Sequence, residues 1–252
     1  MLNELFSIAG KTALVTGGSR GIGRAIAQRL AADGARVAIN YHSNKAAADE
    51  VVAAIRDAGG DAFALPGDVG DLTAITAIFT AFDAEADGLD ILVNNAGIGE
   101  IASIGETDEA LYDRLMQTNA KGPFFLTRAA LSRLRDGGRI VNISSMVSRA
   151  AYPACNAYAM SKAALNMMSL SLAQELGPRG ITVNAVAPGA TMTDFAPALF
   201  EDPATVDYLA SVAALKRVGY PADIAGVVAF LASPDGGWVT GQLIEASGGT
   251  HL

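Results

Sequence analysis

Short runs of apolar residues alternate with longer stretches of helical periodicity along almost the whole chain. The first six of these runs lack the in/out alternation of a sheet with one solvated face, which is typical of strands buried on both faces. The runs that predict β-strands are 11–16, 35–41, 61–66, 90–95, 138–144, 181–188 and 241–246.

Helical patterns fill the intervals between these runs, and we expect the longest of them to end or kink before Pro123. Strands separated by helices need crossover connections, which give a parallel sheet with helices on both faces. We therefore predict an α/β fold of the doubly wound Rossmann type, whose ligands bind beyond the carboxyl ends of the strands. The predicted helices are 21–33, 44–58, 71–86, 107–135, 157–176 and 221–232.

Composition predicts one large domain. The chain has 252 residues, of which 51% are apolar and 17% charged, so it can bury a sizeable core. The sequence contains no low-complexity segment, charge run or Pro/Ser-rich linker. We predict a single dinucleotide-binding domain over residues 1–252.

The net charge of −8 argues against nucleic acid and anionic membranes as partners. The start, MLNELFSIAG, does not resemble a secretory signal, and no window approaches the ~18 apolar residues of a membrane span. The single cysteine, Cys155, excludes an intramolecular disulfide and fits a reducing compartment. We expect a soluble, cytoplasmic protein. His42 and His251 are isolated, so we expect no metal site.

A glycine-rich turn joins the first predicted strand to the first predicted helix. TGGSRGIG runs from Thr16 to Gly23, with glycines spaced as G-x-x-x-G-x-G. A pyrophosphate site needs a sharp turn, a close backbone approach and the free N–H groups of a helix N-terminus. The turn predicts a dinucleotide site, although a glycine-rich turn without a ligand fits the same pattern.

The residues after the second predicted strand favour NADP(H) over NAD(H). NAD sites commonly place an Asp or Glu about 20 residues after the turn, where it binds the ribose 2′-OH. Asn40 stands at that place, followed by Tyr41 and Ser43, and the next carboxylate is Asp49. Asn40 and Ser43 are neutral donors for a 2′-phosphate. Arg20 in the glycine turn can meet the same phosphate, although a solvated loop arginine is the alternative.

Tyr158 and Lys162, four residues apart in YAMSK, predict a proton-transfer pair. Residues at this spacing share one face of a helix. Lowering a tyrosine pKa from ~10 by ~3 units requires ~4 kcal/mol. One charge at ~4 Å provides about that much at an effective dielectric constant near 20, so an ammonium group is an effect of the right size. By itself, such a pair is more often a helix surface contact.

Several motifs, in order along nearly the whole chain, resemble those of the short-chain dehydrogenase/reductase family. TGGSRGIG resembles its cofactor turn, and Asp68 in GDVGD resembles the aspartate that holds the adenine ring. NNAG, which ends at Gly97, resembles the segment after the family's fourth strand. PGATMT resembles the segment that meets the nicotinamide carboxamide, with Thr191 and Thr193 at the contacting positions.

The catalytic motifs show the same resemblance. Tyr158 and Lys162 match Y-x-x-x-K, Ser145 lies 13 residues before Tyr158, and Asn119 in QTNAKG resembles the catalytic-helix asparagine. The resemblance implies a seven-stranded parallel sheet, carbonyl/alcohol redox chemistry and a homotetramer. The cofactor-binding residues predicted from these motifs are Gly17, Ser19, Arg20, Gly21, Ile22, Gly23, Asn40, Tyr41, Ser43, Asp68, Val69, Asn95, Ala96, Gly97, Tyr158, Lys162, Pro188, Gly189, Thr191 and Thr193.

The resemblance also assigns roles to the catalytic residues. Tyr158 donates the proton to the carbonyl oxygen, or accepts it in reverse, while Lys162 lowers the Tyr158 pKa and binds the nicotinamide ribose. Ser145 hydrogen-bonds the substrate oxygen. Asn119 holds a water that links Lys162 to solvent.

The segment from Phe195 to about Lys216 is apolar and helical, and its position predicts a flap over the substrate at about 190–216. Phe195 from this flap, with Met146, Val147 and Tyr152 from the opposite wall, predicts an apolar or aromatic small-molecule carbonyl or alcohol as substrate. The INYHSN stretch is more similar to naphthol reductases than to 3-oxoacyl-[acyl-carrier-protein] reductases.

Two other functions fit parts of the sequence. Carrier-protein reductases dock an acidic partner on basic residues; Arg179 matches one such position, but Asp136 reverses the charge at the other. The second alternative is a catalytically idle dinucleotide-binding sensor, which the fold permits. The catalytic residues, which this chain keeps, argue against it.

Overall fold

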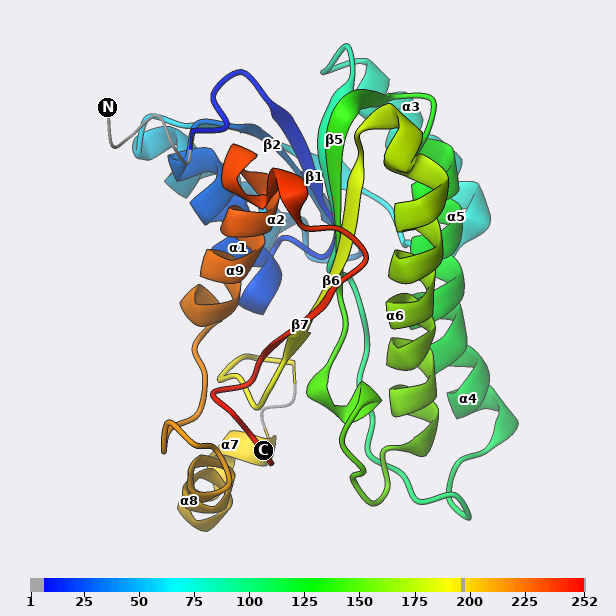
Figure 1. Cartoon of the computed structure of the whole chain (residues 1–252), viewed down its shortest axis with the longest axis vertical. Coiled ribbons are helices and arrows are strands. Elements are labelled where there is room, and N and C mark those ends of the chain that lie inside the picture. Colours follow the sequence, from blue (N-terminus) through cyan, green and yellow to red (C-terminus); the bar gives the residue numbers. More distant parts are fainter. Residues whose placement is uncertain (1–6, 196–197, 252) are drawn as a thin grey trace.

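The computed structural model describes residues 7–195 and 198–251, which contain a parallel sheet in the order β3-β2-β1-β4-β5-β6-β7 (Figure 1). Each predicted strand overlaps one observed strand, so the predicted Rossmann-type sheet is confirmed. The order reverses between β1 and β4, which creates the switch point where such sheets bind ligands. The strands are β1 (Thr12–Val15), β2 (Arg36–Tyr41), β3 (Asp61–Pro66), β4 (Leu89–Asn94), β5 (Leu134–Ile143), β6 (Thr182–Pro188) and β7 (Leu243–Ala246).

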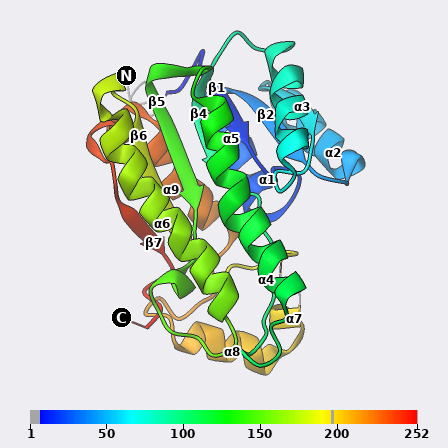
Figure 2. The ribbon, with the colours of Figure 1, turned by 90° about the vertical axis from the view of Figure 1, so that its right-hand side faces the viewer.

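Helices cover both faces of the sheet (Figures 1 and 2). On β1, Ala13 and Val15 pack into the core on one face while Leu14 packs into the core on the other. Both alternating sets are apolar because both are buried, which explains the continuous apolar runs in the sequence. One face carries α1 (Gly21–Ala32), α2 (Lys45–Asp57) and α9 (Pro221–Ala232); the other carries α3 (Leu72–Asp83), α5 (Gly122–Ala130) and α6 (Asn156–Leu176).

The predicted break before Pro123 is a single π-helical turn. This turn, η2 (Gln117–Lys121), joins α4 (Glu109–Met116) to α5, in which Pro123 is the second residue. Proline is tolerated there because the first N–H groups of a helix have no partner within it. A Cβ on Gly122 would lie 2.6 Å from the Val69 carbonyl oxygen, so glycine lets α5 pack against the turn after β3.

The end of the predicted helix 107–135 is wrong, because β5 already begins at Leu134. Leu134 pairs with Leu89 of β4, and the register then shifts so that Arg139 pairs with Ile91. Pairing with β4 therefore overrides the short helical pattern in the sequence. The residues between Leu134 and Arg139 outnumber those opposite them on β4, and they form an irregularity around Gly137.

The predicted flap lies beyond the carboxyl ends of the strands (Figure 1). It contains α7 (Ala198–Glu201) and α8 (Pro203–Ser211), so the helical prediction is confirmed; residues 196 and 197 lie outside the described part. Its first residues are fixed to the segment before α9: Met192 N–H donates to the Gly219 carbonyl at 2.9 Å, and Gly219 N–H donates to Ala190 O at 2.8 Å. In residues 7–195 and 198–251, no helix is long and apolar enough to cross a bilayer.

Candidate active site

The glycine turn has the shape that a pyrophosphate requires. Gly17 has a φ of +61°, and a Cβ there would lie 3.0 Å from the Cα of Ala96. A Cβ on Gly23 would overlap the Gly17 carbonyl oxygen. Only glycine at this position therefore lets α1 begin so close to β1. Arg20 is the N-cap of α1 but gives no side-chain cap, which leaves the first N–H groups of the helix for an anion. Ser19 and Ile22 are half-buried in the same turn.

Thr16 locks the glycine turn to the segment after β4. Its hydroxyl accepts hydrogen bonds from Asn95 N–H and Ala96 N–H, both at 3.0 Å, and donates to Val93 O at 3.3 Å. The Asn95 side chain donates in return to Thr16 O and Gly17 O at 2.8 and 3.2 Å. We did not predict Thr16 as a site residue, although it opens the TGGSRGIG motif.

Asn40 supports the turn instead of facing a ligand. It is 1% exposed, and its amide donates to Leu65 O and Gly67 O at 3.2 and 3.0 Å. Both donor hydrogens are therefore used, and the predicted hydrogen bond from this side chain to a 2′-phosphate is wrong. The Tyr41 ring is also buried in the core, so Arg20 and Ser43 are the two of the four predicted polar contacts at this end whose side chains are exposed.

Asp68 lies at the rim of the site, beyond β3. One carboxylate oxygen accepts from Gly70 N–H at 2.8 Å, and the other lies 3.9 Å from His42 Nε2. The side chain stays 41% exposed, whereas the neighbouring Val69 is buried. The arrangement fits the predicted adenine contact, which remains a prediction.

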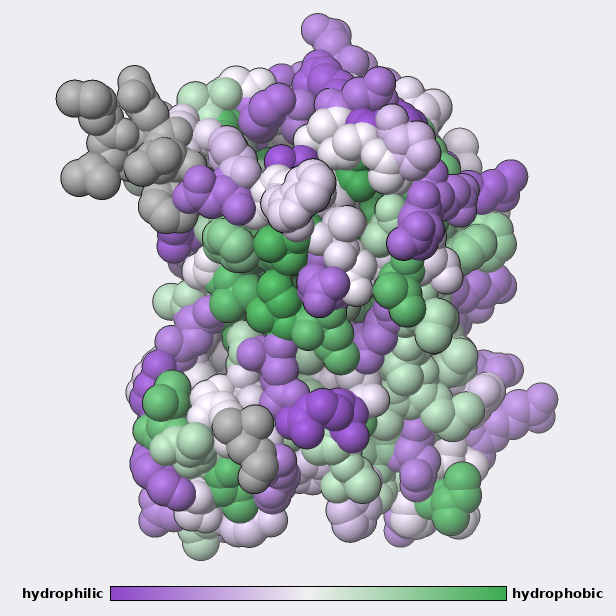
Figure 3. Space-filling view, viewed as in Figure 1, coloured by the Kyte–Doolittle hydropathy of each residue, from purple (hydrophilic) through white to green (hydrophobic). Residues whose placement is uncertain are grey.

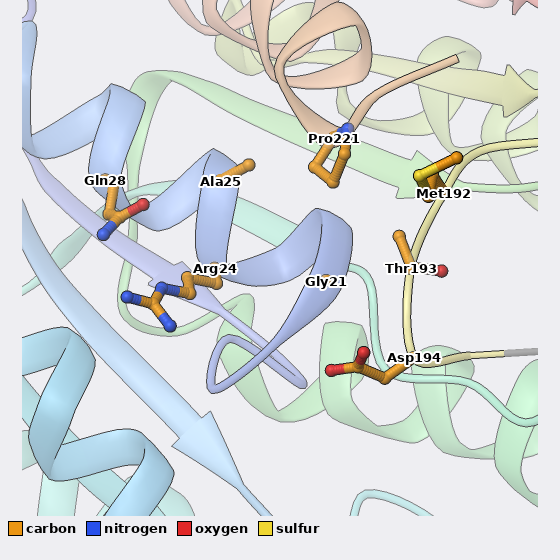
Figure 4. A pocket seen from close by; sticks show the side chains of 8 residues that line it. All are labelled: Gly21, Arg24, Ala25, Gln28, Met192, Thr193, Asp194 and Pro221. Atoms are coloured by element: carbon orange, nitrogen blue, oxygen red, sulfur yellow. The ribbon is translucent and has the colours of Figure 1, made fainter. Parts of the chain in front are cut away.

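The segment from Pro188 to Thr193 approaches the glycine turn from β6. The Thr193 side chain lies 3.4 Å from where a Cβ on Gly21 would stand, and Thr191 is buried with its hydroxyl donating to Gly189 O at 2.9 Å. Figure 4 shows the cavity beside this approach, with a volume of about 310 Å³. Its lining residues are Gly21, Arg24, Ala25, Gln28, Met192, Thr193, Asp194 and Pro221.

Ser145, Tyr158 and Lys162 come together where β5 ends and α6 begins. Ser145 is the N-cap of the short helix η3 (Met146–Ser148) and lies close enough to Tyr158 to hydrogen-bond its hydroxyl. Lys162 is 3% exposed, and its Nζ donates to the Ile143 carbonyl at 2.9 Å. The same Nζ lies 5.8 Å from the centre of the Tyr158 ring.

Asn119 is fully buried in the π-helical turn and fixes the position of α6. Its side-chain oxygen accepts from Ile98 N–H at 2.9 Å, and its amide donates to Ile98 O at 2.8 Å and Ser161 Oγ at 3.0 Å. Ser161 in turn donates to the Tyr158 carbonyl at 2.7 Å. We did not predict this role for Ser161, because a small residue between Tyr158 and Lys162 gives no chemical signal.

Gly97 leaves the space beside the ammonium group of Lys162 unfilled. A Cβ on Gly97 would lie 3.1 Å from Asn119 Oδ1 and 3.2 Å from Lys162 Nζ. The absence of a side chain therefore leaves room beside both groups, as a ribose bound by Lys162 would need.

Burial sets the acidity of both members of the pair. It raises the pKa of Tyr158 to about 12, against a lowering by the Ser145 hydroxyl, and it lowers the pKa of Lys162 to about 8. Both shifts favour the neutral form, as desolvation does. We predicted that Lys162 lowers the Tyr158 pKa; within the polypeptide itself, desolvation outweighs any such effect.

A chain of buried polar side chains ties α6 to the sheet. Asn94 donates to Asn142 Oδ1 at 2.7 Å and to Thr127 at 3.0 Å, and Asn142 donates to Ser169 at 2.8 Å. These bonds cross from β4 to β5 and on to the helices of one face. They hold α6 in place against the sheet.

The predicted substrate residues border the catalytic pair to different degrees. The Phe195 ring lies 6.3 Å from the Tyr158 ring, and a Cβ on Gly99 would lie 2.5 Å from it. Met146 is 4% exposed, so it offers little surface to a substrate. Val147 and Tyr152 are half-buried on the loop that follows Ser145.

Comparisons with known proteins identify the family. A protein-family model described as Enoyl-(Acyl carrier protein) reductase matches residues 17–251. The chain is 46% identical to an uncharacterized oxidoreductase of Methylorubrum extorquens, over 97% of this chain and 99% of that protein. The chain belongs to the short-chain dehydrogenase/reductase family, whose members are oxidoreductases.

Two further relatives are named for their reactions. A probable tetrahydroxynaphthalene reductase of Zymoseptoria tritici is 39% identical, over 95% of this chain and 94% of that protein. The crystal structure of the angucycline C-6 ketoreductase LanV with bound NADP is 46% identical with a TM-score of 0.92, over 97% of this chain and 96% of that one.

We predict that replacing Lys162 by Met changes how stability depends on pH. Between the folded pKa of about 8 and the ordinary value of 10.5, the unfolded chain binds a proton at Lys162 that the folded chain does not. This group therefore makes the free energy of unfolding rise with pH above 8, by at most ~1.4 kcal/mol per unit. Below pH 8 the buried amine is charged in the folded protein, and its desolvation lowers the free energy of unfolding. The uncharged Met side chain avoids this loss.

Denaturant unfolding of both proteins between about pH 7 and pH 9.5 measures this effect, because groups that the two proteins share cancel in the difference. We expect Lys162→Met to be the more stable protein at neutral pH, with a gap that narrows as the pH rises. A gap that is constant over this range would contradict the assignment.

Proposed function

We propose that the protein is an NADP(H)-dependent reductase that transfers a hydride between the nicotinamide and a ketone or secondary alcohol with an apolar or aromatic body. The observation that carries the proposal is the meeting of Ser145, Tyr158 and Lys162 at the carboxyl end of the sheet, beside the glycine turn. The bound cofactor would supply the hydride and, once oxidised, a positive charge beside the pair.

The chain's own residues would handle the proton. Ser145 and Tyr158 hydrogen-bond the carbonyl oxygen, which orients the carbonyl and stabilises its developing negative charge. Tyr158 gives its proton to this oxygen as the hydride reaches the carbon, and the buried ammonium of Lys162 stabilises the resulting phenolate. The high pKa of Tyr158 keeps the phenol protonated and ready to donate at neutral pH.

Phe195 supports an aromatic substrate. Its ring is 43% exposed and stands beside the ring of Tyr158, so an apolar substrate would cover it. The names of two similar proteins, a tetrahydroxynaphthalene reductase and an angucycline ketoreductase, describe ring compounds as substrates and support the same class here.

A carrier-protein substrate is the second candidate, and one ion pair argues against it. Arg179, the basic residue that matches a docking position, donates to the Asp136 carboxylate at 2.8 Å. Asp136 thus both reverses the charge at the second position and neutralises the first. This surface therefore offers an acidic carrier protein no net positive charge on which to dock.

A catalytically idle sensor is disfavoured because Ser145, Tyr158 and Lys162 are held by neighbours that a binding role alone would not need. The hydrogen bonds from Asn119 to Ser161, and from Ser161 to Tyr158, position the catalytic turn of α6.

The first prediction for this function concerns Tyr158→Phe. Loss of the proton donor should lower kcat/KM by ~10²–10⁴-fold while the dissociation constant for NADPH changes little, since only the phenolic oxygen is removed. The assay follows NADPH consumption with ketones, quinones, aldehydes and 3-oxoacyl thioesters. Tyr112→Phe on the surface of α4 is the matched control. Near-normal turnover by the Tyr158→Phe variant contradicts the mechanism, and activity on carrier-bound thioesters alone contradicts the substrate class.

Cofactor preference provides the second prediction. Arg20 is exposed and has no side-chain partner in residues 7–195 and 198–251, so its charge is available to a 2′-phosphate. Arg20→Ala should raise KM for NADPH by about tenfold and leave KM for NADH nearly unchanged, because the lost interaction is one charge-assisted hydrogen bond. Arg29→Ala, farther along α1, controls for the change in net charge. Equal losses with both cofactors would refute this role.

We also propose a homotetramer, and with it the cytoplasmic location that the free thiol of Cys155 favours. Hydrophobic residues gather over α9 and β7 (Figure 3). β7 is an edge strand, and Trp238, in the turn between α9 and β7, is 99% exposed. A second apolar face, on α6, exposes Met160, Met167 and Leu170. Two separate self-complementary faces generate a closed tetramer with two-fold axes.

Light scattering tests this assembly. We expect a mass of four 25.8 kDa chains for the native protein and a dimer for Met167→Glu, because a buried charge opens only the α6 interface. A native protein that runs as a monomer at micromolar concentration would overturn the proposal.

A further inference from the structure

Three residues other than glycine have a left-handed backbone in the described ranges: Ala154 (φ 61°), Lys216 (φ 53°) and His251 (φ 52°). Such conformations cost ~1–3 kcal/mol each and collect at functional sites. Ala154 lies on the loop 146–155 that follows Ser145, Lys216 at the end of the flap, and His251 on the segment 247–251 that follows β7. Hydrogen bonds connect the segment 247–251 both to the loop 146–155 and to the end of the flap, so the three left-handed residues lie in adjoining segments.

The segment 247–251 is bonded to the flap. His251 N–H donates to Val212 O at 3.2 Å, and Thr250 forms an antiparallel bridge with Ala213. Ala214 and Leu215 donate to Gly249 O and Gly248 O at 3.1 and 3.0 Å. Backbone bonds alone therefore fix where this segment and the end of the flap lie relative to one another.

The same segment contacts the loop 146–155 through side chains. Arg149 forms an ion pair with Glu245 at 2.5 Å and donates to Thr250 O at 3.4 Å. The rings of Tyr152 and His251 lie 5.4 Å apart with a 54° tilt, which is the geometry of an aromatic pair. The segment thus joins the two walls of the predicted substrate site.

Tyr152 connects this pair to the catalytic residues. Burial raises the pKa of its phenol, and the side chains of Tyr208 and Cys155 lie near enough to raise it further. Cys155 has a similar effect on the pKa of Tyr158. Tyr152 and Cys155 lie on the loop that joins Ser145 to α6, the helix that carries Tyr158, so this loop links the aromatic pair to the catalytic residues.

We propose that Tyr152 and His251 form a specificity-determining wall that binds the distal ring of a planar, hydroxylated, fused-ring ketone. Their rings offer apolar faces, and the phenol and imidazole offer hydrogen-bonding groups for ring hydroxyls. Phe195 would contact the ring that carries the reacting carbonyl. The inference rests on the proposed reductase function and specifies its substrate.

A purely structural role does not account for the His251 side chain. This residue is exposed, and the bonds that hold its segment come from the backbone, Arg149 and Glu245. The His251 ring is exposed, lies against Tyr152 and sits on a left-handed backbone. We infer that this arrangement serves to contact a bound molecule.

The test compares two ketones in the NADPH assay: a bicyclic aromatic ketone with a phenolic hydroxyl, and an acyclic aliphatic ketone of similar size. We expect His251→Ala and Tyr152→Leu each to lower kcat/KM for the bicyclic ketone about tenfold, mainly through KM, since each removes one face of the wall. The kcat/KM for the acyclic ketone should change less than about twofold. The double variant should lose little more than either single variant, because the two rings act together.

His251→Phe is the matched control, since it keeps the ring and removes the nitrogens. It should retain bicyclic turnover within about threefold, and thermal melting should show that all variants fold. Equal losses for both ketones would show a structural role and overturn the inference, as would unchanged kinetics in His251→Ala.

The wild-type protein separates this inference from the function on which it rests. If it reduces the acyclic ketone but not the bicyclic one, the aromatic wall is refuted and the reductase function stands. If it reduces no ketone with either nicotinamide cofactor, the reductase function itself fails and the wall fails with it.

Discussion

The buried ammonium group of Lys162 is the constraint on which the rest of the site depends. An amine that is 3% exposed loses most of its hydration, and its hydrogen-bond acceptor is the carbonyl of Ile143 at the end of β5. Because burial is unfavourable for this group, it keeps its position against Ile143 only if the helix that carries it is held in place. Asn119, Ser161 and the polar chain from Asn94 to Ser169 provide that support.

The sheet explains why these groups meet. Strands buried on both faces leave their carboxyl ends as the place where polar residues gather, and the reversal between β1 and β4 opens that edge. Thr16 and Asn95 join the two sides of the reversal through both backbone and side chain. The glycine turn and α6 are therefore parts of one hydrogen-bonded framework, in which Gly17 and Gly97 leave room between the two.

The sequence was sufficient for the class of sheet and for most of the helices, because buried strands and helical periodicity leave distinct patterns. The spacing from Ser145 to Lys162 also predicted which side chains the fold brings together. It was insufficient where a residue's role depends on which way its side chain turns. Asn40 follows the expected pattern for a phosphate ligand but faces the backbone of β3 and the turn after it. Ser161 and Thr16 are too common in type to signal their roles, and the start of β5 depends on pairing with β4, which local periodicity does not encode.

The flap is hydrogen-bonded to the rest of the protein at both of its ends. Its first residues are bonded to Gly219, and its last residues are bonded to the segment after β7. Thr191 and Thr193, beside the glycine turn, lie next to the first anchor, whereas α7 and α8 lie between the two anchors. Sequence change in α7 and α8 can therefore alter the surface that these helices present without disturbing the anchored segment beside the glycine turn.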